Sequence, residues 1–209
     1  MPSRLYYIHD PMCSWCWGYR PVWDELQMLL PESVQVHYVV GGLAPDNDQP
    51  MPLAQQQMIQ AHWRTIRDKL GTEFNFDFWL NNTPRRSTYN ACRAVIAAKK
   101  QGMELPMIDA IQRGYYLQAQ NPSDISALCL MAETLTVQHT GFDIDLFKKD
   151  ISSDEVEGEL VAQIALARKL TQQGFPSLVL AHQDRYSNIA VNYLDARQSL
   201  QEISALLNL

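Results

Sequence analysis

Two cysteines, Cys13 and Cys16, lie where a predicted strand gives way to a predicted helix, and this junction most constrains how the chain can fold. The apolar stretch over residues 4–9 is typical of a strand that ends at Asp10-Pro11, and helical spacing begins directly after Cys13. The first N–H groups of a helix lack intrahelical partners, and the helix dipole favours negative charge there. A thiolate at Cys13 would therefore be stabilised, and thiolate is the reactive form of cysteine. The pattern predicts a redox-active dithiol.

Two other interpretations of this cysteine pair stay open. A zinc half-site would need a second pair of ligands, but Cys92 and Cys129 are isolated in the sequence, so we expect no metal. Two buried structural thiols are the other possibility, although Cys13 follows a strand-ending proline, where we expect exposure to solvent. We favour the redox interpretation and expect Cys92 and Cys129 to be unpaired core residues.

The N-terminal pattern predicts a strand–helix–strand unit. The helix is expected over residues 14–30, with Pro21 inside it, and a β-branched, alternating stretch over residues 34–40 predicts the second strand. A connection of this length implies a right-handed crossover between parallel strands.

A long helix-rich region follows a cluster of glycine, proline and acidic residues at positions 41–50. Residues 74–80 are expected to be irregular. Helical spacing predicts helices over residues 52–70, 88–101, 106–120, 123–139 and 143–149.

The C-terminal part returns to mixed structure. A capping box at residues 152–155 predicts the start of a helix that Gly174 would end. Strands are expected over residues 177–181 and 186–191, antiparallel to each other, and a final helix is expected after a cap at Asp195.

Two stretches in the expected order resemble the thioredoxin superfamily. Residues 13–26, CSWCWGYRPVWDEL, resemble its active-site helix, which starts at the first cysteine and carries a proline eight residues later, here Pro21. Residues 174–180, GFPSLVL, resemble its cis-proline loop and the core strand that follows. The helical region between them is similar to the DsbA-like branch, which includes FrnE-like disulfide oxidoreductases. The resemblance implies an α/β thioredoxin-like fold formed by residues 1–44 and 155–209, with an all-helical insertion over residues 45–154.

The resemblance also implies roles for individual residues. Cys13 would attack a substrate disulfide, Cys16 would resolve the mixed disulfide, and Pro176 would lie in the cis-proline loop beside them. The Ser14-Trp15 pair between the cysteines provides no positive charge. We therefore expect a reduction potential near the middle of the family's range and less oxidising than that of a periplasmic oxidant.

Residues around the motif are expected to bind substrate or to pack in the core. The Phe175 backbone would pair with a bound peptide, and the exposed parts of Met12, Trp15 and Trp17 would form an apolar contact surface. Core packing is expected to account for some of these aromatic residues. His9 and Asp10, which flank the site, are expected mainly to make backbone contacts at the end of the strand.

Residues 85–94 resemble helix starts in a related branch, which contains kappa-class glutathione transferases and 2-hydroxychromene-2-carboxylate isomerase. Arg85 and Arg86 could bind the carboxylates of glutathione, but we favour a solvated surface cluster. Those relatives usually carry serine at the reactive position, whereas Cys13 and Cys16 here favour thiol–disulfide exchange. A glutathione-dependent isomerase or transferase is therefore an alternative function, and a binding module that only inherits the fold is another.

The charge and hydropathy of the chain exclude several partners. A net charge of −6 over 209 residues argues against nucleic acid, and no apolar run is long enough for a membrane span or a secretory signal. We expect a cytoplasmic protein with nothing removed from its N-terminus. Its partners would be protein or peptide thiols and disulfides, with glutathione as a possible co-substrate and no metal or nucleotide cofactor. Oligomeric state is left open.

Overall fold

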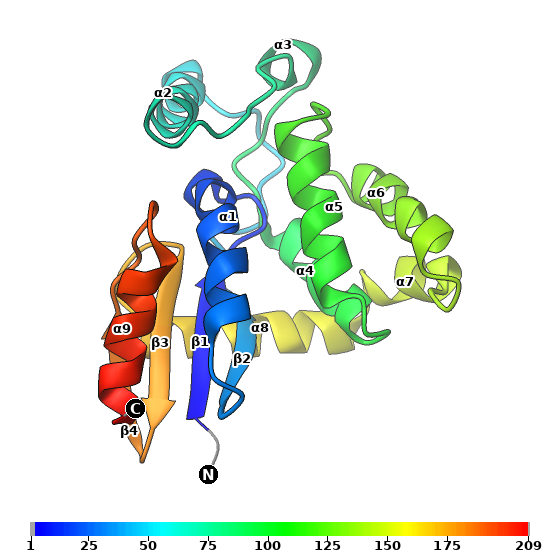
Figure 1. The fold of residues 1–209 in the computed structure, drawn as a ribbon. Coiled ribbons are helices and arrows are strands. Elements are labelled where there is room, and N and C mark those ends of the chain that lie inside the picture. Colours follow the sequence, from blue (N-terminus) through cyan, green and yellow to red (C-terminus); the bar gives the residue numbers. More distant parts are fainter. Residues whose placement is uncertain (1–2, 209) are drawn as a thin grey trace.

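A four-stranded mixed sheet organises one end of the molecule (Figure 1). The computed structural model describes residues 3–208. The strand order is β2-β1-β3-β4. The strands are β1 Ser3–His9, β2 Val34–Val40, β3 Ser177–His182 and β4 Arg185–Ile189. β1 runs parallel to β2 and antiparallel to β3, and β4 is antiparallel to β3. The predicted parallel and antiparallel pairings are both confirmed.

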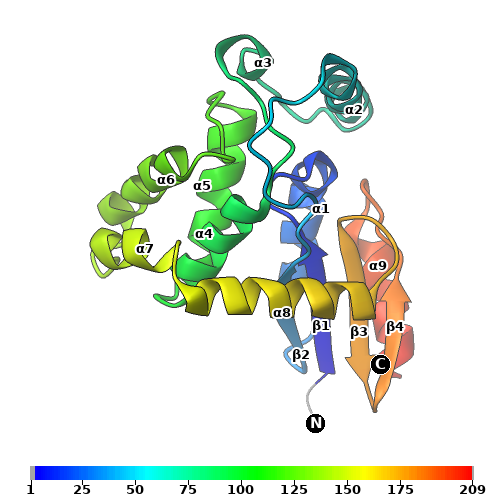
Figure 2. The ribbon, with the colours of Figure 1, turned by 180° about the vertical axis from the view of Figure 1, so that it is seen from behind.

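Helices cover both faces of the sheet. α1 (Ser14–Leu29) and α9 (Ala196–Leu207) lie on one face, and α8 (Asp154–Leu170) runs across the strands on the other (Figures 1 and 2). Successive side chains of a strand point to opposite faces, so β1 contributes Leu5 and Tyr7 to the core under α1 and Ile8 to the core under α8. The architecture is the thioredoxin-like α/β fold that the sequence predicts.

Six further helices lie between β2 and α8 in the chain, beyond one end of the sheet (Figure 1). Their core is rich in aromatic side chains that surround the fully buried Trp63. The N-terminal half of α8 packs into this same core through Val156 and Leu160, so α8 joins the helical region to the sheet. The six helices are α2 Leu53–Leu70, α3 Phe78–Asn81, α4 Tyr89–Lys99, α5 Glu104–Tyr116, α6 Ile125–Gln138 and α7 Ile144–Asp150.

The division into residues 1–44, 45–154 and 155–209 stays a prediction, because the cores on either side of these boundaries are continuous. Met12 and Val40 belong to the same buried cluster as the inserted helices. No helix within residues 3–208 has the length and apolar character needed to cross a membrane.

Helix ends follow the predicted caps where a side chain accepts a backbone N–H. Ser153 accepts from the Val156 N–H at the start of α8, and Asp195 accepts from the Arg197 N–H at the start of α9. Other predicted ends were wrong, among them the end of α5 at Tyr116, which lies before the predicted position. α5 begins at Glu104, because Pro106 is tolerated anywhere among the unpaired N–H groups of a first turn. α8 ends at Leu170, because Thr171 turns to extended backbone well before Gly174.

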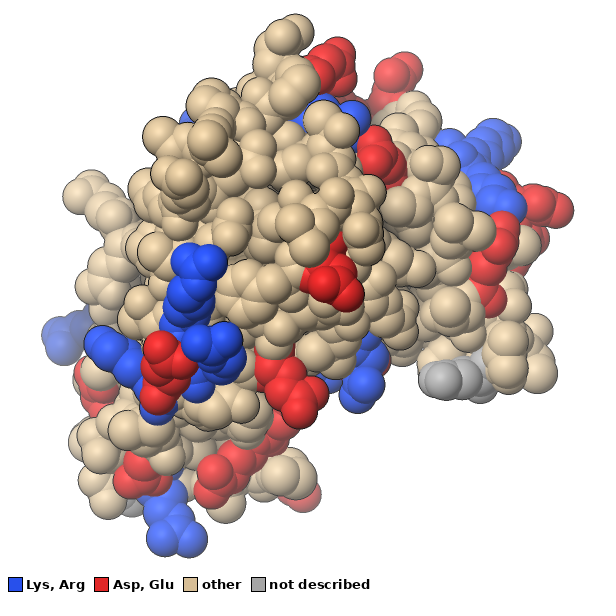
Figure 3. Space-filling view, turned by 90° about the horizontal axis from the view of Figure 1, so that it is seen from above, with Lys and Arg blue, Asp and Glu red and all other residues tan. Residues whose placement is uncertain are grey.

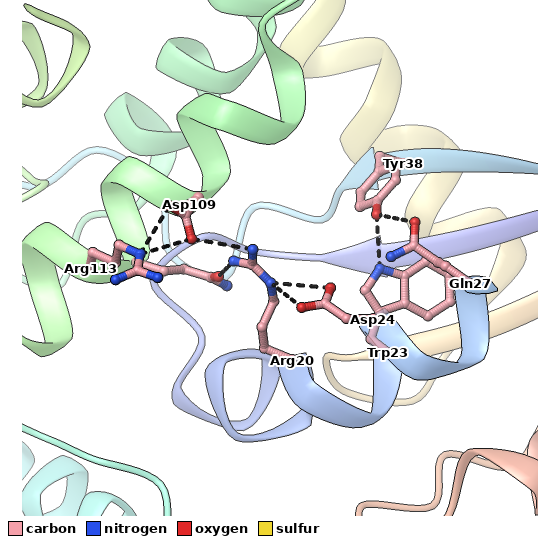
Figure 4. A network of polar contacts seen from close by, with 8 residues as sticks. Arg20, Trp23, Asp24, Gln27, Tyr38, Asp109 and Arg113 are labelled. Carbon is pink, nitrogen blue, oxygen red and sulfur yellow. Dashed lines mark hydrogen bonds and ion pairs between the residues drawn. The ribbon is translucent and has the colours of Figure 1, made fainter. Parts of the chain in front are cut away.

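Polar contacts attach α1 to α5 (Figure 4). Arg20 on α1 pairs with Asp24 on its own helix and reaches across to α5, where Nη2 lies 3.2 Å from Asp109 and Nη1 donates to Gln112 at 2.9 Å. Asp109 also pairs with Arg113, one turn along α5. This network fixes the helix that carries both cysteines against the inserted helices.

Candidate active site

Cys13 lies at the N-cap of α1, with extended backbone, and Cys16 lies one turn further along the helix. The Cys13 N–H donates to the Asp10 carbonyl at 3.0 Å, and the Cys13 carbonyl accepts from the Trp17 N–H at 3.1 Å. Cys16 has no exposed surface and Cys13 is only 6% exposed. The expectation that Cys13 is exposed was therefore wrong, because the Phe175 loop lies directly against it.

The loop before β3 lies directly against Cys13. The Cys13 thiol donates to the Phe175 carbonyl, with Sγ and O 3.3 Å apart, and the Phe175–Pro176 peptide bond is cis. The Phe175 ring packs onto the backbone of Gly41, where an added Cβ would lie 2.1 Å from the ring Cζ. The structure thus brings Phe175 and Pro176 to the cysteine pair, and the bare backbone of Gly41 makes room for the ring that anchors this loop.

Asp10 is a buried carboxylate that joins three segments around the site. Its Oδ1 accepts from the Met12 N–H at 2.8 Å, and its Oδ2 accepts from the Leu43 N–H and from the Thr88 hydroxyl, both at 2.7 Å. Burial raises the pKa of the Asp10 carboxyl, and these hydrogen bonds oppose that effect. The expected backbone contacts are confirmed. The contact with Thr88 was missed, because nothing in the sequence pairs residues 78 positions apart.

His9 is fully buried between aromatic rings. Its ring stacks on Tyr7, with centroids 5.2 Å apart, and meets Tyr38 edge-on at 5.7 Å. Its carbonyl accepts from the Gly41 N–H at 2.7 Å, which is the backbone contact expected of it. Neither ring nitrogen has a hydrogen-bond partner among the described residues, and burial lowers the pKa of His9 to about 3. His9 is therefore neutral at physiological pH.

The Cys16 thiol is held in its protonated form. Burial raises the pKa of the Cys16 thiol well above its ordinary value, and the adjacent Cys13 side chain adds to this effect. Phenols surround the pair, and burial likewise raises the pKa of Tyr7 and Tyr116. The two sulfurs thus differ in surroundings, because Cys13 borders a pocket and Cys16 lies behind it.

A pocket of about 270 Å³ opens at Cys13. The predicted contact residues Met12, Trp15 and Phe175 line it, together with side chains of the inserted helical region such as Met58 and Ile59. The pocket therefore lies where the thioredoxin-like part meets the inserted helices.

Trp17 is the predicted contact residue that the structure does not bring to this pocket. Its ring stacks on Tyr116, with centroids 5.7 Å apart, and its Nε1 donates to the Glu73 carbonyl at 3.0 Å. Trp17 thus packs against the inserted helical region.

Arg85 and Arg86 are partly buried and both line the pocket, so they do not form the solvated surface cluster that we favoured. Arg85 forms an ion pair with Asp124.

All four cysteines are free, with Cys92 buried and Cys129 partly exposed. Within residues 3–208 no group of three or more His, Cys, Asp or Glu side chains is arranged to hold a metal ion.

The fold, with a cysteine pair at the start of α1 and a proline loop beside it, defines a DsbA-like member of the thioredoxin superfamily. Residues 6–201 match the thioredoxin family, and the chain belongs to that family. It resembles over its whole length a candidate protein disulfide isomerase from Nitrosomonas europaea, with 26% identity and a TM-score of 0.85, covering 100% of this chain and 98% of that one.

A second solved structure supports the same fold. The cytosolic disulfide reductase DsbM from Pseudomonas aeruginosa has 19% identity and a TM-score of 0.77, with 98% of each chain covered. DsbM was also solved with GSH, and that structure has a TM-score of 0.76 at 20% identity, covering 99% of this chain and 100% of that one.

Two curated relatives carry a different description, the ClpXP adapter protein SpxH. The protein from Halalkalibacterium halodurans is 25% identical over 184 residues, covering 85% of this chain and 58% of the relative. The protein from Bacillus subtilis is 22% identical over 198 residues, covering 92% of this chain and 64% of the relative. The chain thus spans about three fifths of the length of these relatives.

Proposed function

We propose that the protein is a thiol–disulfide oxidoreductase in which Cys13 attacks and Cys16 resolves. The observation that carries the proposal is the position of Cys13. Its sulfur lies at the N-terminal end of α1, at the wall of a pocket, and 3.3 Å from the Phe175 carbonyl. Helix amides at this end favour a thiolate, and the buried Cys16 lies one turn away to receive the disulfide.

The reaction proceeds in two exchanges. The Cys13 thiolate attacks one sulfur of the substrate disulfide, a mixed disulfide forms, and the other substrate sulfur leaves as a thiolate that takes up a proton. Cys16 then loses its proton to the second departing sulfur and attacks Cys13 Sγ. The substrate gains two electrons and two protons, and the protein is left with a Cys13–Cys16 disulfide. The reverse sequence oxidises a substrate dithiol.

The Phe175 carbonyl connects this chemistry to substrate binding. In the reduced protein it accepts from the Cys13 thiol, and a thiolate or a disulfide sulfur has no proton to donate to it. The carbonyl is then free to accept an N–H from the backbone of a peptide substrate, as expected for Phe175 in this family.

The substrates proposed are protein and peptide disulfides, with glutathione as co-substrate, in a cytosolic setting. The likeness to DsbM, a cytosolic disulfide reductase solved with GSH, supports this choice. The volume of about 270 Å³ lies just below the range of about 300–1,000 Å³ typical of small-molecule sites. It suits a small thiol or one or two residues of a peptide.

Insulin reduction in the presence of dithiothreitol tests the function. Cys13→Ala should abolish the activity, and Cys16→Ala should accumulate mixed disulfides at Cys13, visible by mass spectrometry. Cys129→Ala, outside the site, is the matched control and should retain activity. Unchanged insulin reduction by Cys13→Ala would refute the proposal.

A second candidate function is adapter-type protein binding, which the description of the SpxH relatives favours. Binding of the purified protein to ClpX, measured by biolayer interferometry, separates the two. Binding that persists in a variant lacking Cys13 and Cys16, with no insulin reduction by the wild type, would support the adapter. Glutathione consumption with an electrophile that survives Cys16→Ala would instead support the isomerase or transferase alternative.

A further inference from the structure

We propose that Arg86 makes the pocket at Cys13 selective for thiols and disulfides that carry a carboxylate. The inference rests on the proposed function for its substrates but concerns a feature of its own, the charge of the pocket wall. It assigns Arg86 as a specificity-determining residue that binds the anionic group of the molecule whose sulfur reaches Cys13.

The two charged side chains that line the pocket are both cationic. They are Arg85 and Arg86, and none of the described residues that line the pocket is Asp or Glu. Arg85 is already neutralised by its ion pair with Asp124. Arg86 is partly buried, and within residues 3–208 no carboxylate lies within ion-pair distance of it. The pocket therefore contains one guanidinium whose charge the described protein does not balance.

This local charge opposes that of the chain as a whole. The net charge is −6, which by itself would repel anions. On the face that Figure 3 shows, Lys and Arg lie in separate groups among mostly uncharged side chains. A basic group that lines the reactive pocket of an acidic protein acts on what enters the pocket, and has little role in general attraction of polyanions.

The rest of the wall fits the carbon stem of such a ligand. Met12, Trp15, Met58 and Ile59 supply apolar surface to the same pocket. A guanidinium presents a planar set of donors that matches a carboxylate in two parallel hydrogen bonds. The shared chemistry is thus a carboxylate separated from a sulfur by a short apolar stem. A low-molecular-weight thiol could supply it, and so could an acidic residue beside a cysteine in a peptide.

Three disulfides that differ only in their end groups test the selectivity: 3,3′-dithiodipropionate (anionic), bis(2-hydroxyethyl) disulfide (neutral) and cystamine (cationic). Each oxidises the reduced protein in a single turnover, forming the Cys13–Cys16 disulfide and two molecules of thiol. Rates are divided by those of free cysteine with the same reagent. We expect the normalised rate to be highest for the anionic disulfide, lower for the neutral one and lowest for the cationic one. In Arg86→Ala the ratio of the anionic rate to the neutral rate should fall about tenfold, which is equivalent to the loss of one charge-assisted hydrogen bond. Arg86→Lys should recover part of the ratio.

Arg64→Ala is the matched control. Arg64 is an exposed arginine of α2 that does not line the pocket, so its loss changes the net charge by the same amount. The ratio should stay at the wild-type value in this variant. Equal normalised rates for the three reagents in the wild type, or an equal fall in the ratio in Arg64→Ala, would overturn the inference.

Alkylation of Cys13 tests the pocket without relying on disulfide exchange. Iodoacetate and iodoacetamide both transfer a carbon to the thiolate with loss of iodide, and they differ in charge. The modified cysteine is identified by peptide mass spectrometry, which separates Cys13 from the partly exposed Cys129. An elevated iodoacetate-to-iodoacetamide ratio at Cys13 that falls in Arg86→Ala supports the anion site. This holds even if none of the disulfides reacts with the protein, because that failure would refute only the proposed function. An unchanged ratio in Arg86→Ala would overturn the anion site.

The same assay distinguishes the two sources of the carboxylate. Oxidised glutathione represents the small thiol, and a disulfide-linked pair of Glu-Cys-Glu peptides with blocked ends represents the acidic peptide. A dependence on Arg86 for glutathione alone assigns a low-molecular-weight substrate, and a dependence for the peptide assigns a protein segment. No dependence on Arg86 for either substrate would contradict the inference.

Discussion

His9 should make the folded protein progressively less stable as the pH falls below 6.5. The pKa of His9 drops from 6.5 to about 3 on folding because the ring is buried without a polar partner. Between these values the unfolded chain binds a proton that the folded chain does not, so stability rises with pH and falls as the pH is lowered. Above pH 6.5 both states are neutral and the effect vanishes.

The size of the stability loss follows from the pKa shift of His9. Each pH unit below 6.5 costs about 1.4 kcal/mol of unfolding free energy. At pH 4.5 the loss from His9 alone is therefore about 2.7 kcal/mol, a large share of the roughly 5–15 kcal/mol that stabilises a typical domain. Asp10 acts in the opposite direction, because an acid with a raised pKa binds its proton more tightly in the folded state and gains stability as the pH falls.

Urea unfolding followed by tryptophan fluorescence at several pH values from 7.5 to 4.5 measures the effect. The difference between wild type and His9→Phe isolates His9, because the contribution of Asp10 is present in both proteins. We expect that difference to shift by about 2.7 kcal/mol in favour of His9→Phe between pH 7.5 and 4.5. Parallel curves for wild type and His9→Phe would refute the reasoning.

Two further predictions concern the surroundings of Cys13. Gly41→Ala places a methyl group 2.1 Å from the Phe175 ring, so the loop must move; we expect a loss of about 1–3 kcal/mol in urea unfolding and a slower reaction of Cys13 with disulfides. If Gly41→Ala is destabilised but Cys13 still reacts with disulfides at the wild-type rate, the position of the loop does not affect the reactivity of Cys13. Asp10→Asn turns an amide donor toward the N–H of Met12 or of Leu43, and should cost about 1–3 kcal/mol in the same assay and remove the stability gained at low pH. An unchanged pH profile in Asp10→Asn would contradict this.

Local patterns in the sequence were enough to predict most of the elements. β2 occupies residues 34–40 as predicted, because alternation and β-branching coincide there. Helix ends were harder, since the end of α8 at Leu170 depends on Thr171, whose hydroxyl contacts Ser177 on the next strand. The four-residue helix α3 was missed because it is a single turn, too short for a periodic pattern.

The site was predictable only in part, for a physical reason. The reactive pair and the Phe175 loop were visible as motifs, whereas the burial of Cys13 was not, because distant segments cover it. The stacking of Trp17 on Tyr116 and the hydrogen bond from Thr88 to Asp10 both join residues that lie far apart in the sequence. Such contacts depend on how the inserted helices sit on the sheet, and one sequence does not contain that information.

Contacts between the segment that carries the cysteines and the inserted helices also set the surroundings of the dithiol. Asp10 accepts a hydrogen bond from the Thr88 hydroxyl of the insertion, and Trp17 stacks on Tyr116. Arg20 forms an ion pair with α5. Each contact starts within four residues of a cysteine and ends in the insertion. A displacement of the inserted helices therefore changes the wall of the pocket and the position of α1 together. Because Arg86 lines the pocket from this same side, the insertion provides both part of the pocket wall beside Cys13 and the charge that we propose selects its substrate.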